Sequence, residues 1–238
     1  MALPINSSTP VYTLTIPSTE QLVKFRPFLI KEEKALLIAQ QSEDPIVMVN
    51  SLKEVINACI KDEVNVDALA TFDLEYIFTQ LRAKSVGEIV DLQLRCDTCV
   101  DEKAVATVKI DLTTIKVEKA ADHISKISLY NDVGITLKYP TMDVIKKLES
   151  LDQSNIESVF DVIVDCIDYI YTTDEIFYAK DQTKAELTEF LNNLTSDQFV
   201  KIQKFFETMP KLKHEIDYSC PVCGKEHHKI LEGLNSFF

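Results

Sequence analysis

The sequence predicts an α+β protein that is largely helical and contains one small antiparallel β unit. Two observations predict this class. Apolar residues recur at the three- and four-residue spacing of helices over about 32–84 and again over about 141–209. Between these stretches, over about 88–139, they alternate with polar residues in the way that half-buried strands do.

The N-terminal part, residues 1–87, is predicted to combine short strands with helices. Val11 to Pro17 alternates as a short strand does, and Leu22 to Phe28 is expected to be extended, because Pro27 favours an extended residue before it. Asp44 can cap a helix whose first residue is Pro45, a position that suits proline. The helices expected in this part cover about 32–41, 45–60 and 74–84.

The remaining part, residues 88–238, is predicted to be built around the β unit. A hairpin turn is expected at Asn131-Asp132, between two of its strands. The strands are expected at about 88–96, 105–117, 124–130 and 133–139.

An acidic helical region is predicted to interrupt the β unit at about 141–209. Residues 141–197 hold 13 Asp and Glu against 4 Lys, a local balance of 4 − 13 = −9. Three capping boxes, in which the first and fourth side chains satisfy free backbone amides, each precede an apolar periodicity. They begin at Ser154, Thr183 and Thr195.

The composition is that of a globular protein with an acidic surface. Of the 238 residues, 46% are hydrophobic and 26% charged, and the net charge is 25 − 38 = −13. Nucleic acids and anionic membranes both attract cationic surfaces, so neither is an expected partner. The sequence has no signal-like start and no apolar run near the roughly 20 residues that cross a bilayer. We expect a reducing cytoplasm, where six cysteines do not indicate three disulfides.

The strongest chemical signal is a set of four cysteines in two C-x-x-C turns. The first is Cys96-Asp97-Thr98-Cys99, and the second is Cys220-Pro221-Val222-Cys223-Gly224. Thiolates two residues apart in a tight turn can share one metal ion, and four sulfurs complete a closed tetrahedral zinc site. Pro221 stiffens the second turn, and Gly224 permits a backbone conformation that directs amides toward sulfur.

The two turns are far apart in the sequence. Between Cys99 and Cys220 lie 220 − 99 − 1 = 120 residues, against roughly 15–20 in a compact zinc ribbon. If both turns bind one structural Zn²⁺, the β unit resembles a split zinc ribbon with the helices inserted between its two cysteine turns. Two unligated thiol pairs and a redox C-x-x-C are the alternatives.

The other cysteines and the histidines carry weaker signals. His227 and His228 lie near the second turn and could replace a cysteine, but with four cysteines available we expect them to be surface residues. Cys59 and Cys166 lie on apolar helix faces and are expected to be buried.

Catalytic residues are not expected in this sequence. It contains no nucleophile elbow, phosphate loop, H-E-x-x-H or dinucleotide fingerprint. A zinc ion held by four cysteines has no open position and cannot activate water. We therefore predict a protein that is not an enzyme.

An acidic stripe is predicted on the helix that follows Ser154. Its members recur at spacings of four, four and three: Glu157, Asp161, Asp165 and Asp168. The apolar positions Ile163, Ile167 and Ile170 are expected on the opposite side of the same helix. The stripe is either a solvated face or a surface that docks on a basic partner.

The N-terminal residues resemble a known family. The blocks Val11–Thr19 (VYTLTIPST), Lys24–Ala39 (KFRPFLIKEEKALLIA), Phe72–Phe78 and Arg82–Glu88 are similar to the baseplate hub assembly family of T-even-type contractile-tailed phages. The resemblance implies a late viral protein that acts in tail baseplate hub assembly and carries no catalytic residues. Family members are hub components or assembly factors that leave the finished particle.

The resemblance leads to the functional prediction. We expect an assembly factor or chaperone that binds other baseplate hub proteins in the host cytoplasm. The alternatives are a permanent subunit of the virion's baseplate hub and, with less support, a zinc-dependent nucleic-acid-binding protein. A second candidate contact surface comprises Arg26, Pro27, Phe28, Lys31, Glu32, Glu33 and Lys34. The same block can also be read as a strand-to-helix junction, with acidic residues at a helix N-terminus.

Overall fold

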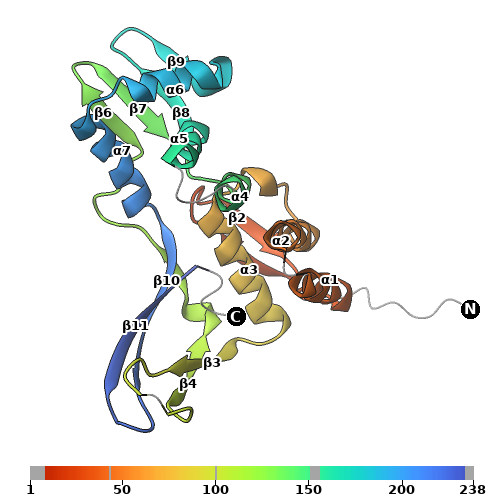
Figure 1. Cartoon of the computed structure of the whole chain (residues 1–238). Coiled ribbons are helices and arrows are strands. Elements are labelled where there is room, and N and C mark those ends of the chain that lie inside the picture. The colour runs from red at the N-terminus through yellow and green to blue at the C-terminus, as the bar shows by residue number, and fades with distance from the viewer. Residues whose placement is uncertain (1–8, 43, 100, 151–155, 234–238) are drawn as a thin grey trace, which may run out of the picture. The chain divides into compact units, whose positions relative to one another are not determined.

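The computed structural model describes residues 9–42, 44–99, 101–150 and 156–233. The chain divides into two compact units (Figure 1). Unit 1 comprises residues 1–118 and 211–238, and unit 2 comprises residues 119–210. The sequence-based division at residue 87 stays a prediction.

Unit 1 begins with a hairpin and three helices around a buried apolar core. The elements are β1 (Tyr12–Thr15), β2 (Leu22–Phe25), α1 (Ile30–Gln41), α2 (Pro45–Cys59), the 3₁₀ turn η1 (Val66–Ala68) and α3 (Thr71–Ser85). Ile56, Leu74 and Ile77 are fully buried at the centre of this core. The predicted cap is confirmed, because the Asp44 side chain accepts a hydrogen bond from the Ile46 amide at 2.8 Å.

The β1–β2 hairpin is fastened to α3 by one buried carboxylate. Asp73 accepts hydrogen bonds from the Ser18 amide at 2.9 Å and the Ala70 amide at 3.2 Å. Burial raises the pKa of Asp73, and these hydrogen bonds oppose the rise. The carboxylate thus satisfies one amide in the hairpin turn and one at the start of the helix.

Two further sheets complete unit 1. A two-stranded sheet holds β3 (Ile89–Arg95) and β4 (Val105–Asp111), and a three-stranded sheet has the order β11-β10-β5. The remaining elements are η2 (Leu112–Thr114), β5 (Lys116–Glu118), β10 (Lys211–Ser219) and β11 (Glu226–Glu232). One core of buried residues joins both sheets to α3, including Ala83, Val90, Ile110, Leu212 and Leu231.

Unit 2 is a four-stranded antiparallel sheet of order β6-β7-β8-β9 accompanied by helices. Its elements are β6 (Lys126–Tyr130), β7 (Val133–Leu137), α4 (Met142–Ser150), α5 (Ile156–Asp165), β8 (Ile167–Tyr171), β9 (Ile176–Tyr178), η3 (Ala179–Asp181), α6 (Lys184–Asn192) and α7 (Ser196–Thr208). Buried residues of β6, β7, β8, α5, α6 and α7 share one core. The capping boxes at Thr183 and Thr195 are confirmed, and the one at Ser154 begins outside the described residues.

The predicted fold class is wrong. In the described residues, seven α-helices accompany eleven strands, and the strands form four separate sheets rather than one small β unit. The two cysteine turns do not belong to a split zinc ribbon, because β3–β4 and β10–β11 lie in different sheets. After β4 the chain turns through η2, and β5 rather than β3 or β4 pairs with β10.

The predicted continuous helix after Ser154 is also wrong in its second half. Helix α5 ends at Asp165, and Ile167–Tyr171 forms the strand β8 in the middle of the sheet. The segment Ile-Asp-Tyr-Ile-Tyr is rich in β-branched and aromatic residues, which fit a pleated sheet better than a helix. Ile167 and Ile170 are still buried, as predicted, but on a strand.

None of the helices in the described part of the chain combines the length and the hydropathy that crossing a bilayer requires.

Gly134 on β7 allows a close approach between strands. A Cβ atom at this position would lie 2.2 Å from the Tyr171 ring and 2.6 Å from the Ile127 carbonyl oxygen. We expect Gly134→Ala to lower the free energy of unfolding by about 1–3 kcal/mol, because the backbone oxygen cannot yield as a flexible side chain can. Ser128→Ala, at the exposed register partner of Gly134, is the control and should change stability by less than about 0.5 kcal/mol in urea unfolding. Equal effects of the two substitutions would contradict this packing argument.

His123 predicts a pH dependence of stability. Its imidazole is buried between Thr208 at 3.0 Å and the Tyr139 hydroxyl at 3.1 Å. Burial and then Lys119 lower the pKa of His123, against a weaker opposite effect of Asp122. As the pH falls below about 6.5, the unfolded chain therefore binds a proton at this histidine before the folded chain does. The contribution of the neutral His123 imidazole to the stability of the fold is complete above that pH and is lost below it.

The thermal unfolding of His123→Gln measures this effect. The difference in melting temperature between the wild type and the variant should be larger at about pH 7.5 than at about pH 5.5. A difference that stays constant over this range would show that the imidazole does not gain a proton on unfolding.

Candidate metal centre

Two hairpin turns of unit 1 bring the four cysteines together. Cys96 and Cys99 lie in the turn between β3 and β4, and Cys220 and Cys223 lie in the turn between β10 and β11 (Figure 1). Each turn is closed by backbone hydrogen bonds: from the Cys96 amide to the Ala104 carbonyl at 2.8 Å, and from the Cys220 amide to the Lys225 carbonyl at 2.9 Å. The four sulfur atoms lie within 4.8 Å of one another.

The spacing of the sulfur atoms suits a tetrahedral metal site. The Sγ atoms of Cys96 and Cys223 are 4.0 Å apart, and those of Cys99 and Cys220 are 3.9 Å apart. A tetrahedron with metal–sulfur bonds of 2.3 Å has sulfur–sulfur edges of ~3.8 Å. These distances are far longer than the ~2.05 Å of a disulfide, and all four side chains are free thiols.

The second turn has the backbone that its sequence predicts. Gly224 has a φ of +71°, in the left-handed region that glycine adopts at no steric cost. In the same turn the Gly224 amide donates to the Cys220 carbonyl at 2.9 Å, and the Val222 amide donates to the Cys220 Sγ at 3.4 Å. The prediction that amides in this turn point toward sulfur is therefore confirmed at Val222.

The four thiols perturb one another electrostatically. Hydrogen bonds from Thr98 lower the pKa of Cys96 to about 5, and the Lys225 amide lowers the pKa of Cys223. The neighbouring Cys223 sulfur and burial raise the pKa of Cys99 to about 12. Four thiolates this close repel one another unless a cation lies between them, so the donor set fits a metal ion.

The isolated cysteines behave differently. Cys59 and Cys166 are both fully buried, as predicted, and neither belongs to the group of four cysteines. Burial raises the pKa of Cys59 to about 11 and that of Cys166 to about 12. Both therefore stay protonated at neutral pH, which suits small apolar core residues.

His227, which the sequence offers as a possible replacement for a cysteine but which was expected at the surface, lies beside the cluster. Its side chain is only 9% exposed, and its Nε2 lies 3.3 Å from the Cys96 Sγ, so the expectation of a surface residue is wrong. The imidazole stacks on Tyr218 with ring centroids 4.9 Å apart, and the Tyr218 hydroxyl donates to the Arg95 carbonyl at 3.4 Å. The alternation of β11 could have placed His227 beside Tyr218, its register partner on β10. His228 is exposed, as expected, and pairs with Asp217 at 2.8 Å.

The predicted contact block, which spans the junction between β2 and α1, divides into buried and exposed residues. Glu32 is 6% exposed, pairs with Arg26 at 2.9 Å and accepts from the Leu29 amide at 2.8 Å. Phe28 is buried and Pro27 half-buried. Lys31 and Lys34 are exposed and Glu33 is half-buried. The structure thus makes Arg26 and Glu32 part of the strand-to-helix junction, while partner binding by the block stays a prediction.

The predicted acidic stripe is split between two elements of unit 2. Glu157, Asp161 and Asp165 lie on α5, but Asp168 lies on β8, so the four carboxylates do not share one helix face. Asp161 forms an ion pair with Lys184 at 2.8 Å. Whether these residues dock on a basic partner stays a prediction.

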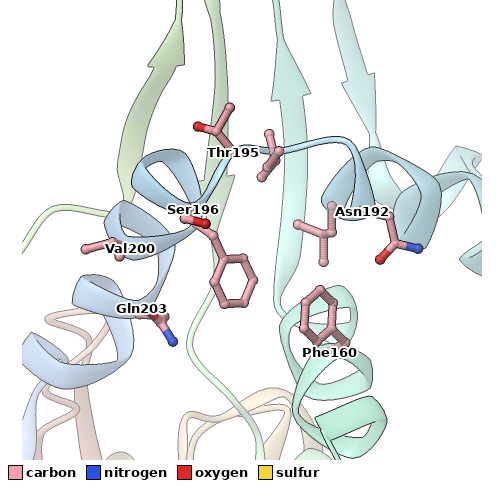
Figure 2. Close-up of a pocket in the computed structure, with 9 residues that line it drawn as sticks. Phe160, Asn192, Thr195, Ser196, Val200 and Gln203 are labelled. Carbon is pink, nitrogen blue, oxygen red and sulfur yellow. The ribbon is translucent and has the colours of Figure 1, made fainter.

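Unit 2 also contains a cavity of about 320 Å³ between α5, α6 and α7, lined by both apolar and uncharged polar side chains. Figure 2 shows Phe160 facing Thr195, Ser196 and Val200 across this space. The Phe160 and Phe199 rings stack at its wall, with centroids 5.0 Å apart. None of the nine described residues that line the cavity carries a titratable side chain, so these residues offer no acid–base group for chemistry.

The chain is similar to known proteins along nearly its whole length. The family model described as T4 bacteriophage base plate protein matches residues 9–238. The baseplate hub assembly protein gp26 of Enterobacteria phage T4 is 24% identical over 227 residues, which cover 95% of this chain and 97% of that protein. No solved structure matches the chain. With almost every residue inside the matched range, the chain belongs to the T4 bacteriophage base plate protein family.

Proposed function

We propose that this protein is a non-enzymatic assembly factor of the phage baseplate hub, which binds other hub proteins before they join the baseplate. The observation that carries the proposal is the similarity over 95% of the chain to a protein named for hub assembly. The cluster of four thiols supports a structural rather than a catalytic role, because four protein ligands leave no open metal position.

The proposal includes a structural Zn²⁺ held by Cys96, Cys99, Cys220 and Cys223. These sulfurs come from two hairpins that belong to different sheets of unit 1. An ion bound by all four would join β3–β4 to β10–β11 at their turns. Zinc binding of this kind contributes on the order of 10 kcal/mol to folding, comparable to the net stability of a domain.

A permanent structural subunit of the baseplate is the second candidate. The observation that favours it is the description of the matched family, which names a base plate protein and not an assembly protein. The two candidates share the same partners, other baseplate proteins. They differ in whether the chain stays in the virion after assembly.

The composition of purified virions tests the function. We expect peptides of this chain in infected cells but only at trace level in washed virions, as measured by quantitative mass spectrometry against known baseplate subunits. A stoichiometric amount in virions would refute the assembly factor and establish the permanent subunit.

Metal analysis tests the zinc site. We expect one equivalent of zinc in the recombinant protein and almost none in Cys99→Ser, because a closed four-sulfur site loses its geometry with one ligand. Removal of the metal with a chelator should lower the melting temperature of the wild type. Cys59→Ala is the matched control: it removes a buried sulfur outside the cluster and should keep the metal even if it is less stable. A wild-type protein without metal would refute the site.

A further inference from the structure

One strand of unit 1 is hydrogen-bonded on one side only. Among the described residues, β3 pairs with β4 alone, in the antiparallel register Ile89↔Asp111 to Arg95↔Val105. A strand at the edge of a sheet leaves a row of N–H and C=O groups unpaired. The second edge of β3 is therefore a template on which another extended chain could form backbone hydrogen bonds.

The register identifies which residues present their backbone at this edge. The Leu112 amide donates to the Glu88 carbonyl and the Cys96 amide donates to the Ala104 carbonyl, both at 2.8 Å, so the even-numbered positions face β4. In an antiparallel ladder alternate residues direct both backbone groups to the same neighbour. Ile89, Asp91 and Gln93 therefore point outward.

The two ends of this edge differ. The next outward carbonyl along β3, that of Arg95, accepts from the Tyr218 hydroxyl at 3.4 Å beside the cysteine cluster. No described residue is a strand partner of Ile89, Asp91 or Gln93 on the side away from β4. The free part of the edge is thus about five residues long, the length of an average strand.

An apolar groove of about 680 Å³ runs along the free part of the edge. Its apolar walls include Leu36 and Leu37 of α1, Met48 of α2, Phe78 of α3, and Val86, the residue that follows α3. Four consecutive residues of β3, from Ile89 to Leu92, line it as well. Side chains of a strand alternate between two faces, so four in succession can share one groove only if the groove follows the backbone edge.

We propose that an extended segment of a partner protein adds to the free edge of β3 as a new strand and places apolar side chains in this groove. The outward backbone groups of Ile89, Asp91 and Gln93 would hold the main chain of the segment, and the groove would select its side chains. This inference rests on the proposed function, in which the chain binds other hub proteins, and assigns a surface to that binding.

The charged residues around the groove indicate which charge the partner segment should carry. Glu33 and Asp91 line the groove against one cation, Arg82, and the whole chain has a net charge of −13. A segment with alternating apolar residues and a Lys or Arg therefore fits better than a second copy of this acidic chain. Pairing between two copies is an alternative outcome of the test.

The experiment uses the full-length chain and a peptide array. Overlapping peptides of about 10 residues, the length of a long strand, cover the other hub proteins of the same phage. We expect the chain to bind peptides with alternating apolar residues and a basic residue. Hydrogen exchange of the complex should then show new protection at the Ile89, Asp91 and Gln93 amides. The Val90 and Leu92 amides, which face β4, should be protected with or without the peptide.

A matched pair of variants isolates the backbone donor. Asp91→Pro removes the outward amide but no hydrogen bond to β4, whereas Asp91→Ala removes the same carboxylate and keeps the amide. We expect peptide affinity to be about tenfold weaker for Asp91→Pro than for Asp91→Ala. If Asp91→Pro does not fold, the alternating protection in the wild type decides the question.

Several results would overturn the inference. One is that Asp91→Pro and Asp91→Ala bind the peptide with equal affinity, and another is that no peptide of the array binds. A third is that amide protection in the complex is confined to residues other than Ile89, Asp91 and Gln93. A fourth is that these amides become protected by self-association when the chain is concentrated without peptide. If intact hub proteins bind the chain without protecting this edge, the inference fails and the proposed function stands. If no intact hub protein binds the chain at all, the proposed function itself fails.

Discussion

The convergence of four sulfur atoms on one point is the constraint on which unit 1 depends. Two hairpins from different sheets place four sulfur atoms within 4.8 Å of one another, although 220 − 99 − 1 = 120 residues separate the two cysteine pairs in the sequence. Thiol groups this close gain little from one another without a cation, whereas four thiolates can bind one metal ion. The apolar core that joins α3 to both sheets brings the hairpins to the same place. A shared ion would then fix the ends that this core leaves exposed.

Capping and turn signals in the sequence predicted local structure correctly, whereas the helical periodicity after Ser154 did not predict the strand β8. The cap at Asp44, the capping boxes at Thr183 and Thr195 and the turn at Gly224 each depend on residues within one turn of the chain. The cysteine set could be recognised because its ligand types and pair spacing are specific. The division of the strands into four sheets could not be predicted, because paired strands such as β5 and β10 are remote in sequence. Neither strand contains a residue pattern that identifies its partner.

The surfaces predicted for partner binding show the same limit. A charge pattern alone does not reveal that Glu32 turns inward to Arg26, or that α5 ends before Asp168. The burial of His227 was not predicted for a related reason: its imidazole stacks on Tyr218 of the neighbouring strand. The unpaired backbone edge of β3 cannot be predicted from the types of its residues. The tertiary structure thus determines which residues of this protein are exposed. Residues that contact a partner can therefore be identified only on the folded chain.

Glu118 and Lys211 are paired in register across β5 and β10, so the chain departs toward unit 2 and returns at neighbouring points of unit 1. This has a consequence for the order of events on the ribosome. The first cysteine pair emerges early, but its partner pair follows only after the whole of unit 2 has been synthesised, about 6–24 s later at ordinary translation speeds. Unit 2 is continuous in sequence and can fold during that delay. The thiol cluster, and the core that uses β10 and β11, can be completed only when this final hairpin leaves the exit tunnel.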